Sequence, residues 1–332
     1  MSGQLSFHSQ WDLPSPAARP GNAPGSPLGE RRGVRFFELP CRSVLNRCTS
    51  ERMPFQWTIN PYRGCEFGCT YCYARYSHEF LGMDDWRDFE EKILVKRAAP
   101  AILPKELTIR RLQGKSIAIG TVTDPYQPAE KEFRVTRGLL EVLARARGLD
   151  LSITTKSALI TRDLELLGAI ASRSRLVINI SLITLSRRMA RLLEPRAPTP
   201  EKRLATLRTL SRAGLRAGIF AMPVLPGLTD SPRALEALVR ASAEAGATHF
   251  VAQFLFLRDS ALKGFLPRLE RDFPALAARY RREYARFAYQ SETARQRLAL
   301  LVSGLRRKYG LSAFGRGGNG EAPSGTASSS LP

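Results

Sequence analysis

The hydrophobic positions between residues 57 and 256 alternate between short apolar runs and longer amphipathic stretches. Each apolar run has the length of a strand buried on both faces, and most are rich in β-branched residues. The predicted strands span residues 57–59, 116–120, 151–155, 176–181, 217–222 and 249–256. Strand and helix alternating in this way predict a parallel sheet with right-handed crossovers. The pattern leaves open whether this sheet closes as a full or partial barrel or stays open and doubly wound.

The stretches between the predicted strands carry apolar residues at helical spacing. Predicted helices lie around residues 86–98, 134–147, 162–172, 200–213 and 232–245. In the second of these, Leu139, Leu140 and Leu143 share one face and arginines occupy the other. Glycines stand where the C-caps of three helices are expected: Gly148, Gly214 and Gly246.

The two ends of the chain differ from its middle. Residues 1–35 are rich in Pro, Gly and Ser, and they predict a disordered tail. Residues 36–260 hold the strand–helix pattern and form the predicted core domain. Residues 261–312 lack strands and predict a C-terminal helical region, and residues 313–332 predict a second disordered tail.

The 332-residue chain has a formal net charge of +21. One interpretation is a polyanionic partner such as DNA or RNA, and the other is an arginine-rich composition without functional meaning. No apolar run approaches the roughly 20 residues of a membrane span. The first residues lack a basic segment followed by an apolar one, so a secretory signal is not expected. We therefore expect a cytoplasmic protein with no membrane partner.

Three of the five cysteines crowd into the segment Cys65-Glu-Phe-Gly-Cys69-Thr-Tyr-Cys72. This spacing indicates metal ligation rather than a disulfide framework, and thiolates suit zinc or iron–sulfur clusters. A zinc site usually takes two separate ligand pairs, and ordinary ferredoxin cubanes take four thiolates with different spacing. A compact trio suits a [4Fe–4S] cluster with one iron left open, and a structural zinc site is the alternative.

The CxxxCxxC spacing, within the string NPYRGCEFGCTYCYAR at 60–75, resembles the radical S-adenosylmethionine (radical SAM) superfamily. The wider string is similar to the branch that contains spore photoproduct lyase and its uncharacterised relatives. The similarity extends in order over residues 40–260. Further matching segments lie at residues 120–128, 154–157, 162–163, 181–184, 194–198 and 223–230.

This resemblance implies an α/β fold, a partial (βα)6 TIM-type barrel with a C-terminal helical extension. It also implies a [4Fe–4S] cluster held by Cys65, Cys69 and Cys72, with SAM bound at the open iron. One electron, from a donor such as flavodoxin or ferredoxin, cleaves SAM to a 5′-deoxyadenosyl radical. That radical abstracts hydrogen from a substrate, which the sequence does not name.

The resemblance also suggests side chains that contact SAM. Tyr71 is expected beside the adenine ring, and Lys156 at the SAM carboxylate or a substrate phosphate. Thr123 and Asp124 stand where the family has a Gly-Gly-Glu segment that meets the SAM amino group. Ser181 is expected at the ribose. Arg196 and Arg203 are two further candidates for contacting the carboxylate of SAM. Each of these residues also fits an ordinary structural role.

Cys41 and Cys48 admit three interpretations. They are inert thiols, or one donates hydrogen to a substrate radical, or both help to hold an auxiliary cluster. Their place upstream of the motif differs from that expected for the donor cysteine of the lyase.

Three functions remain open. The first is a radical SAM enzyme that acts on nucleic acid, such as a DNA photoproduct. The second is radical SAM modification of a small molecule or peptide, and the third is a non-catalytic iron–sulfur or zinc protein. If the positive charge binds nucleic acid, basic residues should cluster on the rim around the open end of the barrel. Those expected there are Arg63, Arg75, Lys156, Arg281, Arg282 and Arg286.

Overall fold

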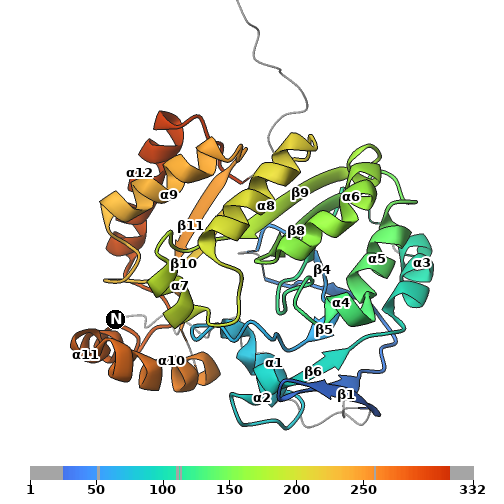
Figure 1. Cartoon of the computed structure of the whole chain (residues 1–332), viewed down its shortest axis with the longest axis horizontal. Coiled ribbons are helices and arrows are strands. Elements are labelled where there is room, and N and C mark those ends of the chain that lie inside the picture. The colour runs from blue at the N-terminus through green and yellow to red at the C-terminus, as the bar shows by residue number, and fades with distance from the viewer. Residues whose placement is uncertain (1–24, 51–52, 110–111, 113, 258, 315–332) are drawn as a thin grey trace, which may run out of the picture.

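The structure is a computed structural model that describes residues 25–50, 53–109, 112, 114–257 and 259–314. Its centre is a seven-stranded sheet of order β11-β10-β9-β8-β7-β4-β3, drawn in Figure 1. The strands are β3 (Leu45–Arg47), β4 (Trp57–Ile59), β7 (Ser116–Ile119), β8 (Asp150–Thr155), β9 (Arg175–Ser181), β10 (Ala217–Val224) and β11 (Phe250–Phe254). The last six are parallel and lie in sequence order, and β3 adds to β4 antiparallel. The six predicted strands and the partial-barrel α/β fold are confirmed.

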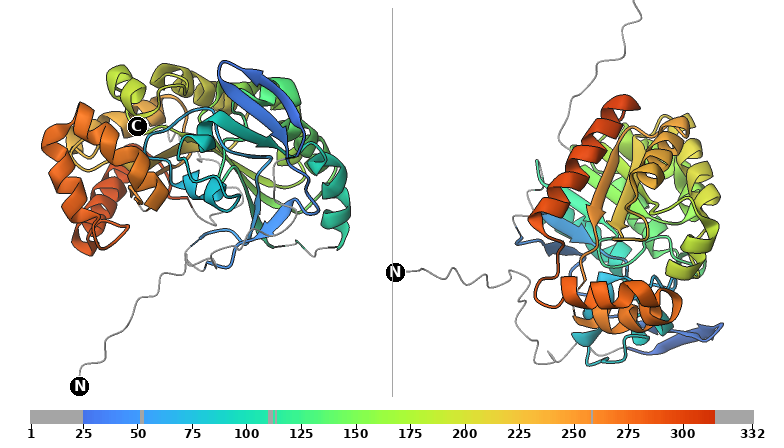
Figure 2. Two further views of the ribbon diagram at one scale, coloured as in Figure 1. Left: turned by 90° about the horizontal axis from the view of Figure 1, so that it is seen from below. Right: turned by 90° about the vertical axis from the view of Figure 1, so that its left-hand side faces the viewer.

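Helices cover the outer face of this sheet (Figures 1 and 2). They are α3 (Ala99–Ile109), α4 (Glu130–Phe133), α5 (Val135–Leu143), η2 (Ala158–Asp163), α6 (Leu164–Ala171), α7 (Arg187–Leu193), α8 (Pro200–Arg212) and α9 (Pro232–Glu244). Thr199 caps α8 by accepting from the N–H of Lys202, next to a proline at the first helical position. Gly214 and Gly246 follow directly after C-cap residues with left-handed φ of 72° and 85°. Gly148 is also left-handed but lies beyond the C-cap of α5.

The two faces of the parallel strands differ in chemistry. Ile117, Ile153, Ile178 and Ile219 belong to the main hydrophobic core, which also includes leucines of α5, α6, α8 and α9. Several alternate positions of the same strands are small or polar, such as Ser152, and they line a large cavity together with larger side chains such as Phe220. The inner positions of β9 are buried as well, so the expectation of strands buried on both faces is confirmed for β9.

A second sheet of order β1-β2-β6-β5 lies beside the barrel. It contains β1 (Pro27–Arg31), β2 (Val34–Glu38), β5 (Tyr62–Arg63) and β6 (Lys92–Val95). The predicted disorder of residues 1–35 is wrong for residues 25–35, which form β1 and enter β2, and residues 1–24 lie outside the described ranges. The helix predicted over 86–98 is also wrong. Only α2 (Asp88–Glu91) is helical there, because residues 92–95 pair with β2.

The C-terminal region is helical, with α10 (Asp259–Asp272), α11 (Pro274–Glu283) and α12 (Glu292–Lys308). Helix α10 packs against η1 (Tyr73–Arg75) and α1 (Tyr76–Glu79), which directly follow the cysteine segment, whereas α12 packs on β11 and α9. Figure 2 shows α10 and α11 as a separate layer at one end of the barrel. No helix in the described ranges is long and apolar enough to cross a membrane. The predicted tail at 313–332 lies outside those ranges from residue 315 onward.

Close packing inside the barrel generates a stability prediction. A Cβ on Gly218 would lie 2.5 Å from Nδ1 of His249. Gly218→Ala should therefore lower the free energy of unfolding by about 1–3 kcal/mol, because the buried imidazole must move. The measurement is urea denaturation followed by circular dichroism.

The matched control is Gly168→Ala in α6, where nothing lies within 4 Å of the added carbon. It should raise stability by about 0.5–1 kcal/mol, because alanine is the better helix former. Equal stability of G218A and wild type would contradict the packing at β10.

Candidate functional site

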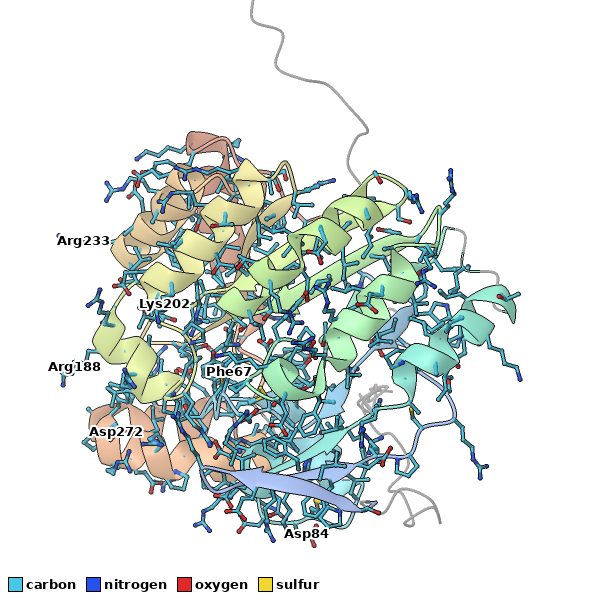
Figure 3. The ribbon with its side chains drawn as sticks, turned by 45° about the vertical axis from the view of Figure 1, so that its right-hand side comes forward. Phe67, Asp84, Arg188, Lys202, Arg233 and Asp272 are labelled. Atoms are coloured by element: carbon cyan, nitrogen blue, oxygen red, sulfur yellow. The ribbon has the colours of Figure 1, made fainter. Side chains whose placement is uncertain are left out.

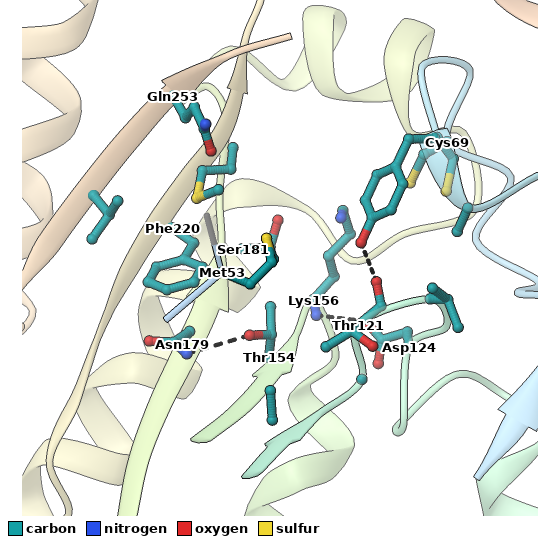
Figure 4. Close-up of a pocket in the computed structure, with 18 of the residues that line it drawn as sticks. Met53, Cys69, Thr121, Asp124, Thr154, Lys156, Asn179, Ser181, Phe220 and Gln253 are labelled. Carbon is teal, nitrogen blue, oxygen red and sulfur yellow. Dashed lines mark hydrogen bonds between the residues drawn. The ribbon is translucent and has the colours of Figure 1, made fainter. Parts of the chain in front are cut away.

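The inward-facing positions of neighbouring strands form layers across the barrel. Thr154, Asn179 and Gly218 are register partners on β8, β9 and β10, and Ser181 pairs in the same way with Phe220 one layer higher. Most of these side chains are too short to fill the lumen, which remains a cavity of about 1400 Å³ (Figure 4). In most parallel barrels bulky branched residues fill that space. A lumen of this size can instead receive ligands at the C-terminal ends of the strands.

The three closely spaced cysteines all lie on the wall of this cavity. Their loop runs between β5 and η1 and is fixed by backbone hydrogen bonds, from Cys65 N to Phe89 O (2.9 Å) and from Thr70 N to Leu193 O (2.9 Å). The carbonyl of Gly64 accepts from Thr123 Oγ1 at 2.6 Å. The loop is thus tied to the ends of several strands and helices before any ligand binds.

Two glycines in this loop are required by its shape. Gly64 and Gly68 have left-handed φ of 85° and 62°. A Cβ on Gly68 would lie 2.8 Å from a guanidinium nitrogen of Arg196. The backbone between the cysteines therefore turns tightly and has no room for a side chain.

The cysteine side chains are free thiols, of which Cys65 and Cys69 are buried and Cys72 is partly buried. Burial raises the pKa of Cys69 to about 12, and burial also raises the pKa of Cys65 and Cys72. Metal binding must therefore displace protons from the thiols. Of the described residues on the cavity wall, three are cysteines and none is a histidine. Within the described ranges no three Cys, His, Asp or Glu side chains converge on a single ion position.

Arg75 was expected on the rim of the barrel mouth, and this expectation is wrong. Its guanidinium is buried, donates to the carbonyl of Cys69 (3.0 Å) and to that of Trp86 (2.6 Å), and lies 4.9 Å from the Trp86 ring centroid. Arg75 thus holds the cysteine loop from behind. Arg281, also expected on the rim, is exposed and pairs with Glu270.

A buried carboxylate, Glu194, organises the charges beside the cysteines. Its carboxylate oxygens lie 2.6 Å from a guanidinium nitrogen of Arg203 and 3.7 Å from the ammonium nitrogen of Lys156. The carboxylate also accepts a hydrogen bond from the hydroxyl of Tyr71. Burial alone would raise the pKa of Glu194, but the charges of Arg203 and Lys156 hold it below the ordinary value. Burial opposes the charge of Lys156, yet Cys69 and Glu194 leave its pKa raised.

The residues expected to contact SAM divide into two groups. Thr123, Asp124, Lys156 and Ser181 line the cavity together with the cysteines, as Figure 4 shows for the last three. Tyr71 does not line the cavity, because its ring is buried and its hydroxyl is engaged by Glu194.

Asp124 is held rigidly at its place on the wall. Its carboxylate accepts from Thr155 Oγ1 (2.6 Å), from Lys156 N (2.8 Å) and from Tyr126 N (2.9 Å). Burial raises the pKa of Asp124 despite these donors.

Sequence analysis missed two residues of the site. Glu194 lies in the segment at 194–198 that matched the family, but no role was derived for it. Tyr73, two positions after Tyr71, lines the cavity and donates its hydroxyl to the carbonyl of Thr121. A tyrosine on each side of Cys72 was the available signal, and spacing alone does not tell which of them faces the lumen.

Cys41 and Cys48 lie away from the cavity wall. Cys41 packs against the main core, and burial raises its pKa. Cys48 follows β3, and its N–H donates to the carbonyl of Gln56 at 2.8 Å. The structure therefore does not bring either thiol to the cysteine trio.

The C-terminal region supplies the outer wall of the cavity. Phe287, which is 70% exposed, lies there with Tyr289 in the segment between α11 and α12. The charged residues on the whole described wall are Asp124, Lys156, Glu283, Glu292 and Arg295. Acidic side chains thus outnumber basic ones around the cavity. Much of the positive charge lies on outer helices, where Arg188 and Arg233 project from α7 and α9 (Figure 3).

A cysteine trio at the C-terminal end of a partial parallel barrel defines a class of cofactor-dependent enzymes. The Radical SAM superfamily matches this chain over residues 59–238. The chain belongs to this superfamily, and membership implies a [4Fe–4S] cluster and SAM as cofactors.

The chain is also similar to proteins of other organisms and, in its fold, to solved structures. The chain is 37% identical to the uncharacterized protein Rv2578c of Mycobacterium tuberculosis, over 90% of this chain and 87% of the relative. It is 31% identical to the uncharacterized protein MJ0683 of Methanocaldococcus jannaschii, over 53% and 62%. Spore photoproduct lyase complexed with dinucleoside spore photoproduct shares the fold, with a TM-score of 0.58 at 15% identity over 82% of this chain and 79% of the lyase.

The Glu194 cluster generates a prediction. Glu194→Gln leaves the buried Arg203 and the partly buried Lys156 without this counter-charge, so the free energy of unfolding should fall by about 3–5 kcal/mol. The control is Glu201→Gln, whose exposed pair with Arg187 should change stability by less than about 0.5 kcal/mol. Denaturation midpoints measure both.

The pH dependence has a definite sign. The pKa of Glu194 is depressed in the folded state. Its ionised carboxylate therefore stabilises the fold fully at pH values above the pKa of the unfolded state, and this stabilisation is lost as the pH falls through the pKa of the folded state. The stability gap between wild type and E194Q should therefore narrow below the ordinary value of 4.5. A gap that widens in acid would contradict the ionised state of Glu194.

Proposed function

We propose that this protein is a radical SAM enzyme in which Cys65, Cys69 and Cys72 hold the [4Fe–4S] cluster. The observation that carries the proposal is one cavity wall on which three cysteine thiols, two of them buried, meet Asp124 and Lys156. The donor set fits the cluster, because soft thiolates are its ligands and three of them leave one iron open. When bound and reduced, cluster and SAM supply a 5′-deoxyadenosyl radical that abstracts hydrogen from substrate.

The residues of the chain bind and orient this chemistry. We assign Lys156 to the carboxylate of SAM, since its ammonium lies on the wall beside Cys69. Asp124, fixed by three donors, is assigned to the SAM amino group, with Thr123 holding the loop carbonyl of Gly64. Ser181 is assigned to the ribose.

Tyr71 has a different role from the adenine contact that the family resemblance suggested. Its hydroxyl positions Glu194, which in turn holds Lys156 toward the cavity. Tyr71 therefore acts on the ligand only indirectly, through Glu194 and Lys156.

The remaining lumen receives the substrate. Hydroxyl and amide groups line it, from Thr154, Asn179 and Gln253, with the ring of Phe220 beside them. The charged wall carries three acidic and two basic side chains, which disfavours a polyanion. We therefore assign a small molecule or peptide as the substrate. A nucleic-acid lesion is the second candidate, favoured by the net charge of +21 and by the fold shared with the lyase.

The cysteine trio can be tested directly. Replacing Cys65, Cys69 or Cys72 by Ser should remove the roughly four irons per chain and the brown colour, because three thiolates leave no spare ligand. Each variant should also lose dithionite-driven conversion of SAM to 5′-deoxyadenosine, followed by chromatography.

Cys41→Ala and Cys48→Ala are the matched controls and should keep both iron and SAM cleavage, since neither thiol lines the cavity. Stoichiometric zinc without iron would refute the proposed function.

The choice of substrate has its own test. Because acidic side chains outnumber basic ones around the cavity and much of the positive charge lies on outer helices, duplex DNA should bind without preference for ultraviolet damage. Its log affinity should fall linearly with log salt. Competition binding measures this, with undamaged DNA as the control. Markedly tighter binding of damaged DNA would move the nucleic-acid lesion to first place.

A further inference from the structure

A second cleft, of about 340 Å³, lies on the other side of the cysteine loop. It is lined by Arg31, Arg32, Arg191 and Arg196 together with one acidic side chain, Glu66. None of its lining residues belongs to the main cavity. Cys65 and Phe67 face the cavity and Glu66 faces the cleft, so a single loop separates the two.

The cleft reaches the backbone between the cysteines. The N–H of Arg196 donates to the carbonyl of Phe67 at 3.3 Å, and its guanidinium lies against Gly68 and pairs with Glu90. Glu66 is buried and held by Arg31 at 3.0 Å. Glu66, in the middle of the trio, thus lines the cleft, and Arg196 ties the cleft to the backbone of Phe67 beside it.

Two of the four arginines remain uncompensated. Arg31 and Arg196 are neutralised in part by Glu66 and Glu90. Arg32 and Arg191 are exposed, and no carboxylate of the described residues pairs with either side chain. The surface over the cysteine loop is therefore cationic, in contrast to the cavity wall.

The β1–β2 hairpin carries two of these arginines, Arg31 and Arg32, and fixes their position. Arg32 and Gly33 form its turn with left-handed φ of 53° and 75°. Strand β2 pairs with β6, and β6 pairs with β5, which leads directly into the cysteine loop. The hairpin arginines are thus fixed relative to the loop through one sheet.

We propose that this cleft is the docking surface for a small acidic one-electron carrier protein, such as an acidic ferredoxin or flavodoxin. This inference rests on the proposed function. With cluster and SAM on the cavity side of the loop, as the proposed function has them, the cleft side stays free for a partner. Acidic carriers complement the arginines, and charge complementarity steers brief encounters with interfaces below roughly 1,200 Å². The reduced carrier loses one electron, the cluster gains it, and no proton or group crosses the interface.

The experiment compares two reductants in the reconstituted protein. One is a reduced acidic [2Fe–2S] ferredoxin, and the other is photoreduced deazaflavin, a small molecule that needs no docking. In Arg32→Glu/Arg191→Glu, the ratio of ferredoxin-driven to deazaflavin-driven SAM cleavage should fall about tenfold, and the ferredoxin Kd should rise by about the same factor. Wild-type affinity should weaken on raising salt to about 0.15 M.

The matched control is Arg208→Glu/Arg233→Glu, which reverses two exposed arginines on α8 and α9. Its ratio and Kd should equal those of wild type. Equal loss in both double variants, or no loss in either, would overturn the docking surface. So would loss of DNA affinity in R32E/R191E with ferredoxin affinity unchanged, which would make the cleft a nucleic-acid contact. Failure of the proposed function shows separately, as no SAM cleavage by wild type with deazaflavin.

Discussion

The structure depends on an open barrel lumen whose walls are stabilised from outside. Apolar side chains on one face of the strands, many of them isoleucines, belong to the core beneath the helices, while many small and polar residues on the other face leave the interior unfilled. Polar groups that line such a lumen must be satisfied or exposed to ligand. Asn179 meets this demand by bonding Thr154 (3.3 Å) and His249 (2.9 Å) across the layer. Burial lowers the pKa of His249 to about 4, so the imidazole is neutral at this contact.

Buried charge is concentrated beside the cysteine trio. Burying charges is costly unless each has a partner, and Glu194 provides one partner for both Lys156 and Arg203. This arrangement holds an ammonium group at the wall of a cavity that is otherwise poor in free positive charge. A site of this kind is preorganised, because its charges are fixed before ligands bind.

The cysteine loop has two faces with opposite electrostatics. Its inner face looks into the lumen, where acidic groups outnumber basic ones, and its outer face looks into the arginine cleft. The strand that introduces the loop belongs to the small sheet, and the helices that follow it pack against α10. Under the proposed docking, substrate and electrons approach the loop from different sides, which different parts of the chain form.

Much of the fold was predictable from local pattern. Each barrel strand contains a short apolar run, so the six of them were found, and the spacing of the trio at 65–72 indicated metal ligation. The segment 92–95 was misassigned as helix, because its apolar residues also fit helical spacing and only pairing with β2 makes them a strand.

The sequence by itself determined the superfamily, the order of the barrel strands and the three cysteines at the site. The tertiary structure decided which side chains of each element point into the lumen. It placed Tyr73 rather than Tyr71 on the cavity wall, buried Arg75 behind the loop, and brought Arg31 and Arg191 from distant segments to one cleft. The physical reason is that ligand spacing is local, whereas burial and charge pairing depend on contacts between residues far apart in the chain.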